Sequence, residues 1–156
     1  MLVESSKLRE KLGGPRVKQF SMFLENKVGA LLDVVKMLKE HNIDVLAVNV
    51  QDSADAAIVR IVVTDPEEVH QLFCTKGIPH SLSDLVVAEL KEGASEFCKL
   101  LTCLLMAEVN IHGSYALLSR PRGFLALALH VEDAECATAV LQSHSFRLLS
   151  QQDLSR

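Results

Sequence analysis

A short polar turn lies between a run of alternating apolar residues and an amphipathic segment, and its sequence is Leu24-Glu25-Asn26-Lys27-Val28-Gly29-Ala30-Leu31. A turn that contains glycine and runs straight into a helix leaves backbone N–H groups unpaired at the positive end of the helix dipole. Glycine also has no side chain that would block the approach of a ligand. The turn therefore has the outline of a site for a small anion, although glycine before a helix is also common for backbone reasons alone.

The residues on either side of this turn predict a strand followed by a helix. Phe20, Met22 and Leu24 alternate within residues 17–24, which is typical of a strand with one buried face. After the turn, apolar residues recur at spacings of three and four, as on one face of a helix, at Val28, Leu31, Leu32, Val35 and Leu38. Asn42 tolerates the left-handed conformation that a helix C-terminus needs, so we expect the helix to end there.

A hairpin and a second helix complete the first half of the chain. The β-branched runs at residues 43–50 and 57–63 predict two paired strands. The stretch Thr64-Asp65-Pro66-Glu67-Glu68 supplies an N-cap, a first-turn proline and acids for a helix that Gly77 ends, and residues 78–82 predict a short closing strand. The predicted order is strand, helix, strand, strand, helix, strand.

The same order begins again at Leu85, and sliding the sequence against itself by 68 residues aligns the halves without a gap. In this register Asn42 falls on Asn110, and Asp65 falls on Asp133. The sequence therefore predicts an α+β fold of two ferredoxin-like βαββαβ units, each with a four-stranded antiparallel sheet and both helices on one face. The expected divisions are an N-terminal arm at 1–16, a first domain at 17–84 and a second domain at 85–156.

Residues 17–154 resemble tandem ACT domains, which are small regulatory modules that sense amino acids. The resemblance rests on Glu25–Leu31, on Asn42-Ile43 at the second strand, and on Thr64-Asp65-Pro66 before the second helix. It is closest to free-standing bacterial two-ACT proteins related to the regulatory subunits of acetohydroxyacid synthase. It implies a non-catalytic regulatory protein that binds a small amino acid at the first-half loop and signals through domain or subunit packing. It also implies a homodimer and, by analogy, a branched-chain ligand and a partner enzyme of amino-acid metabolism.

Carried over to this sequence, the resemblance names six ligand-binding residues: Asn26, Lys27, Val28, Gly29, Ala30 and Leu31. Asn26 would form a side-chain hydrogen bond with the ligand, and backbone would come close to it at Gly29. Leu31 would line the pocket, which a neighbouring domain usually completes. In the second half, the 68-residue register puts Phe97 where Gly29 stands, so we expect the second site to be degenerate.

Composition excludes several other functions. The net charge of −4 leaves no basic surface for nucleic acid or for an anionic membrane, and the lack of a signal peptide or long apolar stretch predicts a cytoplasmic protein. The four cysteines contain no C-x-x-C pair and are expected to be reduced core residues. The six histidines contain no pair at the i, i+4 spacing and are expected to be solvated or capping, so we expect no metal and no cofactor.

Two rival functions stay open at this point. One is an interaction module whose sites are lost and whose repeated sheet serves only for oligomerisation. The other is a small enzyme on the same frame, although no set of acid, base and nucleophile can be named and we therefore expect no enzyme. Arg120 and Arg122 flank a proline in an exposed turn, where they either keep the turn soluble or meet an anionic group of a partner.

Overall fold

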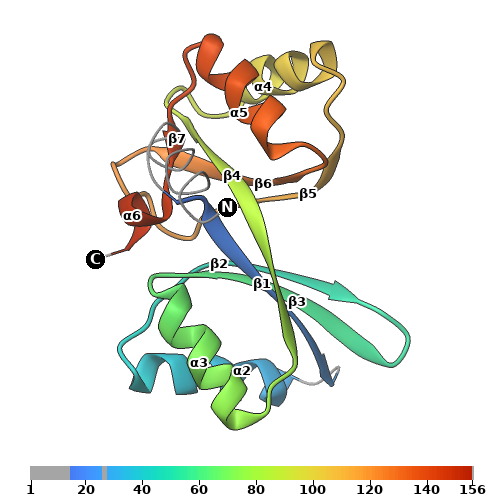
Figure 1. Ribbon diagram of the computed structural model, residues 1–156, viewed down its shortest axis with the longest axis vertical. Helices are drawn as coiled ribbons and strands as arrows, with labels where there is room; N and C mark the ends of the chain where they lie inside the picture. The colour runs from blue at the N-terminus through green and yellow to red at the C-terminus, as the bar shows by residue number, and fades with distance from the viewer. Residues whose placement is uncertain (1–14, 26–27, 156) are drawn as a thin grey trace, which may run out of the picture. The chain divides into compact units, whose positions relative to one another are not determined.

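The computed structural model describes residues 15–25 and 28–155 and divides them into two units. The first unit contains Lys18–Ser83 with Ser155, and the second contains Asp84–Leu154 with residues 15–17. Figure 1 shows that each unit has two helices on one face of an antiparallel sheet, as the predicted ferredoxin-like architecture requires.

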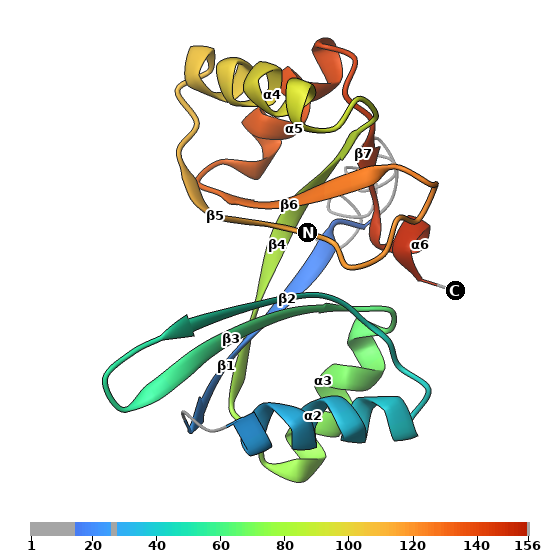
Figure 2. The ribbon, with the colours of Figure 1, turned by 180° about the vertical axis from the view of Figure 1, so that it is seen from behind.

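The first unit follows the predicted order closely. Its elements are β1 (Val17–Glu25), α2 (Val28–Glu40), β2 (Val45–Asp52), β3 (Ala56–Val63), α3 (Pro66–Lys76) and the start of β4 (His80–Leu90). The strand order is β2-β3-β1-β4, with β3 antiparallel to both β2 and β1. Figure 2 shows the β2–β3 hairpin beside β1, with α2 and α3 together on one side.

Alternation along β1 builds the core of the first unit. Phe20 lies opposite Ile61 and Met22 lies opposite Val59, and all four side chains are buried beneath the helices. Phe23 has the opposite parity, points away from this core and is 72% exposed. Burial of one face of the sheet therefore fixes the register of the strands, because a slip of one residue would expose the whole apolar set.

The predicted helix ends of the first unit are confirmed. Asp65 is the N-cap of α3, where its Oδ1 accepts a hydrogen bond from the backbone N–H of Glu68 at 3.3 Å, and Pro66 occupies the first turn. Gly77 ends α3 in the left-handed conformation with φ of 68°. Asn42 follows α2 with φ of 59°, as the sequence predicted for a residue that tolerates this region.

The second unit repeats the arrangement with different details. It contains the remainder of β4, then α4 (Ala94–Met106), β5 (Ile111–Ala116), β6 (Leu125–Val131), α5 (Ala134–Ser143), β7 (Leu148–Leu149) and α6 (Gln151–Leu154). β4 lies between β7 and β6, and β5 forms the outer strand next to β6. The short helix α6 was not expected from the sequence.

Two expectations about the chain between the units were wrong. A strand closing the first half at 78–82 and a new first strand beginning at Leu85 were predicted, but β4 is one strand from His80 to Leu90. Neither Gly nor Pro interrupts this segment, so the polar pair Ser83-Asp84 does not break the extended backbone. Its first residues belong to the first unit and its remainder to the second.

The cysteines also differ from prediction. All four are free, but only Cys103 is fully buried, whereas Cys136 is half-buried and packs against the core of the second unit. Cys74 and Cys98 are exposed on α3 and α4. The expectation that all four cysteines are core residues was therefore wrong for these two.

Candidate functional site

The predicted ligand loop connects β1 to α2. β1 ends at Glu25 and α2 begins at Val28, so the loop itself is Asn26-Lys27, which lies outside the described residues. The four other predicted site residues, Val28, Gly29, Ala30 and Leu31, form the first turn of α2. They present the first backbone N–H groups of the helix, which have no acceptor within it.

Neither backbone conformation nor packing requires glycine at position 29. Its φ lies outside the left-handed region, and a Cβ built on it would meet no atom within 4 Å. Glycine in a helix instead lowers stability by about 0.5–1 kcal/mol relative to alanine. The structure therefore leaves Gly29 without a local structural role, and among the described residues it leaves open space at the Cβ position of Gly29.

The side chains around Gly29 divide between core and surface. Leu31 is half-buried and packs against the core of the first unit, so it faces the sheet. Val28 is 88% exposed, and Leu32, one turn further along α2, is 47% exposed although its spacing predicted a buried face. The start of α2 thus carries an exposed apolar pair beside the open position at Gly29.

The matching turn of the second unit corrects the predicted alignment. Val28 and Ala94 begin α2 and α4, Glu40 and Met106 end them, and both pairs are separated by 66 residues. Asn42 and Glu108, which follow these helices with left-handed backbones, have the same separation. The gapless 68-residue register is therefore wrong for the first helix of each unit. Gly29 matches Ser95, so Phe97 does not occupy the glycine position.

Two side chains of the first turn of α4 form hydrogen bonds with the loop that precedes the helix. A carboxylate oxygen of Glu96 accepts a hydrogen bond from the backbone N–H of Lys91 at 3.1 Å, and the Ser95 hydroxyl donates to the Glu92 carbonyl at 3.2 Å. Glu96 also places a negative charge at the positive end of the helix. The corresponding turn of α2 contains no acidic residue, so the two helix starts differ in charge as well as in side-chain bulk.

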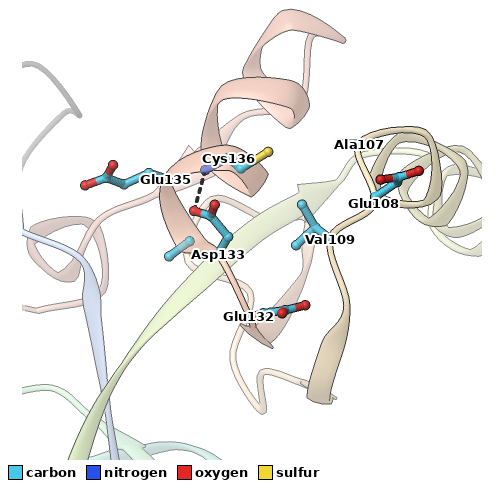
Figure 3. Close-up of a pocket in the computed structure, with 8 residues that line it drawn as sticks. Ala107, Glu108, Val109, Glu132, Asp133, Glu135 and Cys136 are labelled. Carbon is cyan, nitrogen blue, oxygen red and sulfur yellow. Dashed lines mark hydrogen bonds between the residues drawn. The ribbon is translucent and has the colours of Figure 1, made fainter.

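A hollow of about 440 Å³ in the second unit was not predicted (Figure 3). It lies where α4 and β6 end and α5 begins, at the far end of β6 from the β4–α4 turn. Its lining consists of Ala107, Glu108, Val109, Glu132, Asp133, Ala134, Glu135 and Cys136. Asp133 caps α5 by accepting from the Cys136 N–H at 3.0 Å, and Glu132 accepts from the Asn110 side chain at 2.9 Å. Capping and strand-end contacts thus account for these two acids.

The turn with Arg120 and Arg122 has a structural role that sequence analysis missed. Nε of Arg122 lies 3.4 Å from Oε1 of Glu89, a β4 residue whose side chain is 1% exposed. Among the described residues, neither oxygen of this carboxylate accepts a hydrogen bond. Arg122 therefore balances a buried charge and is more than a solubilising residue.

One cluster of potential metal ligands was also missed. His70, Cys74 and His80 come together at the surface of the first unit, with ligand atoms within 4.8 Å of one another. The sequence signal was the i, i+4 spacing of His70 and Cys74, which a search for pairs of histidines alone does not detect.

In a comparison with known families, the profile of an ACT domain pair matches residues 16–156. The chain therefore belongs to the ACT domain family, whose members are regulatory, amino-acid-binding modules and are generally non-catalytic. A comparison with curated proteins gave no match. Among the described residues, no helix has the length and apolar character needed to cross a membrane.

Solved structures share the architecture. Protein BT0572 from Bacteroides thetaiotaomicron is 26% identical, with a TM-score of 0.81 over 90% of this chain and 96% of its own. The ligand-free regulatory subunit of aspartate kinase from Thermus thermophilus is 16% identical, with a TM-score of 0.60 over 83% of this chain and 91% of its own. The aspartate kinase likeness supports the fold alone.

Proposed function

We propose that this protein is a non-catalytic regulator that binds a small amino acid at the β1–α2 loop of the first unit, through residues 26–31. The observation that carries the proposal is the first turn of α2 at Gly29, where glycine carries no side chain and an added Cβ would meet no atom of the described residues within 4 Å. A ligand carboxylate would accept hydrogen bonds from these N–H groups at the positive end of the helix. Asn26 and Lys27 would supply polar side chains from the loop.

The difference between the two helix starts supports a single ligand site per chain. Glu96 and Ser95 form hydrogen bonds with the loop before α4, and Glu96 brings a negative charge to the first turn, whereas α2 has glycine and no acid there. A carboxylate ligand would be repelled at α4 and accepted at α2. The second site is therefore proposed to be degenerate because of Glu96 and Ser95.

Regulation would follow from a change in packing. Val28 and Leu32 present exposed apolar surface beside the ligand loop, and burial of that surface by a second subunit or a partner enzyme would couple assembly to ligand binding. A ligand that binds one assembly better than another shifts the equilibrium between them. We propose a homodimer in the cytoplasm, consistent with four free cysteines, and branched-chain amino acids as the first ligands to test.

A thermal-shift screen against the twenty amino acids tests this function. A ligand at a hundred times its Kd stabilises the folded chain by about 2.7 kcal/mol, and we expect one or a few amino acids to raise the melting temperature in this way. If no amino acid shifts the wild-type protein, the binding proposal fails. The exposed Phe23 would then favour the second candidate, a ligand-free interaction module.

A further inference from the structure

Three residues with metal-binding side chains meet on the surface of the first unit. His70 and Cys74 are one turn apart on α3, and both are exposed. Gly77 reverses the chain after α3, the Ile78 N–H bonds back to the Phe73 carbonyl at 2.9 Å, and His80 begins β4 half-buried beside the helix. The chain reversal at the end of α3 thus places His80 of β4 next to His70 and Cys74, which are four residues apart on the helix.

Hydrogen bonds orient the two imidazole rings. Nδ1 of His80 lies 2.9 Å from the Ile78 carbonyl, and because a carbonyl only accepts, this nitrogen carries the hydrogen. In the neutral ring this leaves Nε2 of His80 as the nitrogen with a free lone pair, and it lies 2.7 Å from Nδ1 of His70. Sγ of Cys74 lies 3.9 Å from Nε2 of His70. A backbone carbonyl that holds one nitrogen of a histidine while the other faces the site is the usual support for a metal ligand.

The ring of His80 is also fixed by packing. Its centroid lies 5.3 Å from that of Phe73, at an angle of 69°, and 5.7 Å from that of Phe20. Both phenylalanines are fully buried in the core of the first unit. The fold thus sets the position of Nε2 of His80, whereas the exposed side chains of His70 and Cys74 are free to change rotamer.

We propose that His70, Cys74 and His80 form a binding site for a divalent metal ion of the zinc class. All ligand atoms lie within 4.8 Å of one another, whereas zinc bonds of about 2.0–2.3 Å place tetrahedral ligands roughly 3.3–3.6 Å apart. Rotation of the exposed His70 and Cys74 side chains would widen the 2.7 Å separation between the two histidine nitrogens and shorten the longer separations to this range. Nitrogen and sulfur donors favour Zn²⁺ over Mg²⁺ or Ca²⁺. Cys74 binds as the thiolate and releases its proton to solvent, and water takes the fourth position.

The site does not depend on the proposed amino-acid site, because it shares no residue with the β1–α2 loop. Within the part of the chain that the structure describes, no other group of three His, Cys, Asp or Glu side chains comes together in this way. The remaining cysteines therefore serve as controls. Cys98 is the matched one, because it is also exposed on a helix but lies in the other unit.

Cobalt titration followed by absorption spectroscopy tests the site on full-length protein without a polyhistidine tag. We expect wild-type protein and Cys98→Ser to bind one Co²⁺ with a thiolate-to-cobalt charge-transfer band and the strong visible bands of tetrahedral coordination. Cys74→Ser should lose the charge-transfer band and bind about tenfold more weakly or worse. Absence of the band in wild-type protein, or its survival in Cys74→Ser, would overturn the proposal.

Zinc competition against the bound cobalt tests the two histidines. His70→Ala and His80→Ala should each weaken zinc binding by about tenfold or more, whereas His144→Ala, which alters an exposed histidine after α5, should not. Because His80 packs against Phe73, the metal-free melting temperature of each variant is measured first. Full zinc affinity in a folded His70→Ala variant would show that the helical pair does not bind the metal.

Discussion

Gly29 and Ser95 occupy the same position in the first turns of α2 and α4, two helices of 13 residues each. Beside Ser95, Glu96 accepts from the Lys91 N–H and places a negative charge at the helix start, whereas an added Cβ at Gly29 would meet open space. Two copies of one fold thus carry two different helix starts. This asymmetry is the main structural support for a single amino-acid site in the first unit.

Gly29→Ala should separate stability from ligand binding. Alanine fits the open space and has the higher helix propensity, so the free energy of unfolding should stay the same or rise by about 0.5–1 kcal/mol. The affinity for the amino acid should fall, because the methyl group stands where the ligand approaches the backbone. Chemical denaturation and calorimetric titration measure the two effects. A variant that is less stable than wild type would show that Gly29 has a structural role.

Arg122→Ala should destabilise the second unit. Removal of the guanidinium leaves the buried Glu89 carboxylate without its ionic partner, at a cost of about 1–3 kcal/mol, toward the lower end because Arg122 is 37% exposed. Arg120→Ala, in the same exposed turn, should change stability by less than about 0.5 kcal/mol.

The double variant Arg122→Ala/Glu89→Gln separates the ion pair from other effects of the arginine. A neutral amide no longer requires a cation, so the second substitution should restore part of the loss. Urea denaturation of the four proteins gives the coupling energy. If the losses of the two single variants simply add, the 3.4 Å contact makes no net contribution.

Asp65→Ala and Asp133→Ala should each lower stability by about 0.5–2 kcal/mol, because each carboxylate caps a helix. Asp65 accepts from the Glu68 N–H at 3.3 Å and Asp133 accepts from the Cys136 N–H at 3.0 Å. Asn at either position can still accept this bond and should retain most of the stability. Thermal unfolding followed by circular dichroism gives the comparison, and equal losses in the Ala and Asn variants would contradict the capping role.

Phe23→Ser tests the second candidate function, an interaction module that self-associates through the helix-free face of the first unit, and in that case it should weaken self-association. The Phe23 ring is 72% exposed. In a dimer that covers the ring, replacement by serine would remove enough buried apolar surface to raise the dimer Kd by about tenfold or more. Leu118→Ser, which alters a 69% exposed residue of the second unit, is the control. Sedimentation equilibrium measures both, and an unchanged Kd for Phe23→Ser would place the interface elsewhere.

Local sequence signals predicted the fold well where they are strong. The cap at Asp65, the left-handed Asn42 and Gly77, and the alternation in β1 all appear as expected, because each depends on neighbouring residues. The continuous strand β4 was missed, since a polar pair at its middle looks like a turn when the pairing partners are unknown.

The internal register shows why alignment by identity alone failed. The bulges at Val45/Ala47 and Ile111/Gly113 match at a separation of 66 residues, but Asp65 and Asp133 match at 68. Two residues are therefore added in the second hairpin, where loops accept insertions without changing the core. The identical pair at Asn42 and Asn110 gave a false register for the first half of each unit.

The candidate sites could likewise be predicted from the sequence only in part. Gly29 could be named from sequence, but the reason for the asymmetry could not, because the hydrogen bond at the start of α4 depends on how Glu96 folds back to Lys91. The metal cluster depends on the reversal at Gly77 that returns His80 to α3. Only His70 and Cys74, which lie four residues apart on α3, can be recognised from their spacing in the sequence.

Isothermal titration calorimetry with the amino acid found by the thermal-shift screen tests the central claim most directly. Wild-type protein and Ser95→Phe should bind one amino acid per chain with the same Kd, whereas Gly29→Phe, whose side chain would fill the open space at α2, should show no binding. Circular dichroism must show that both variants are folded. Full binding by folded Gly29→Phe, or loss of binding in Ser95→Phe alone, would contradict the account.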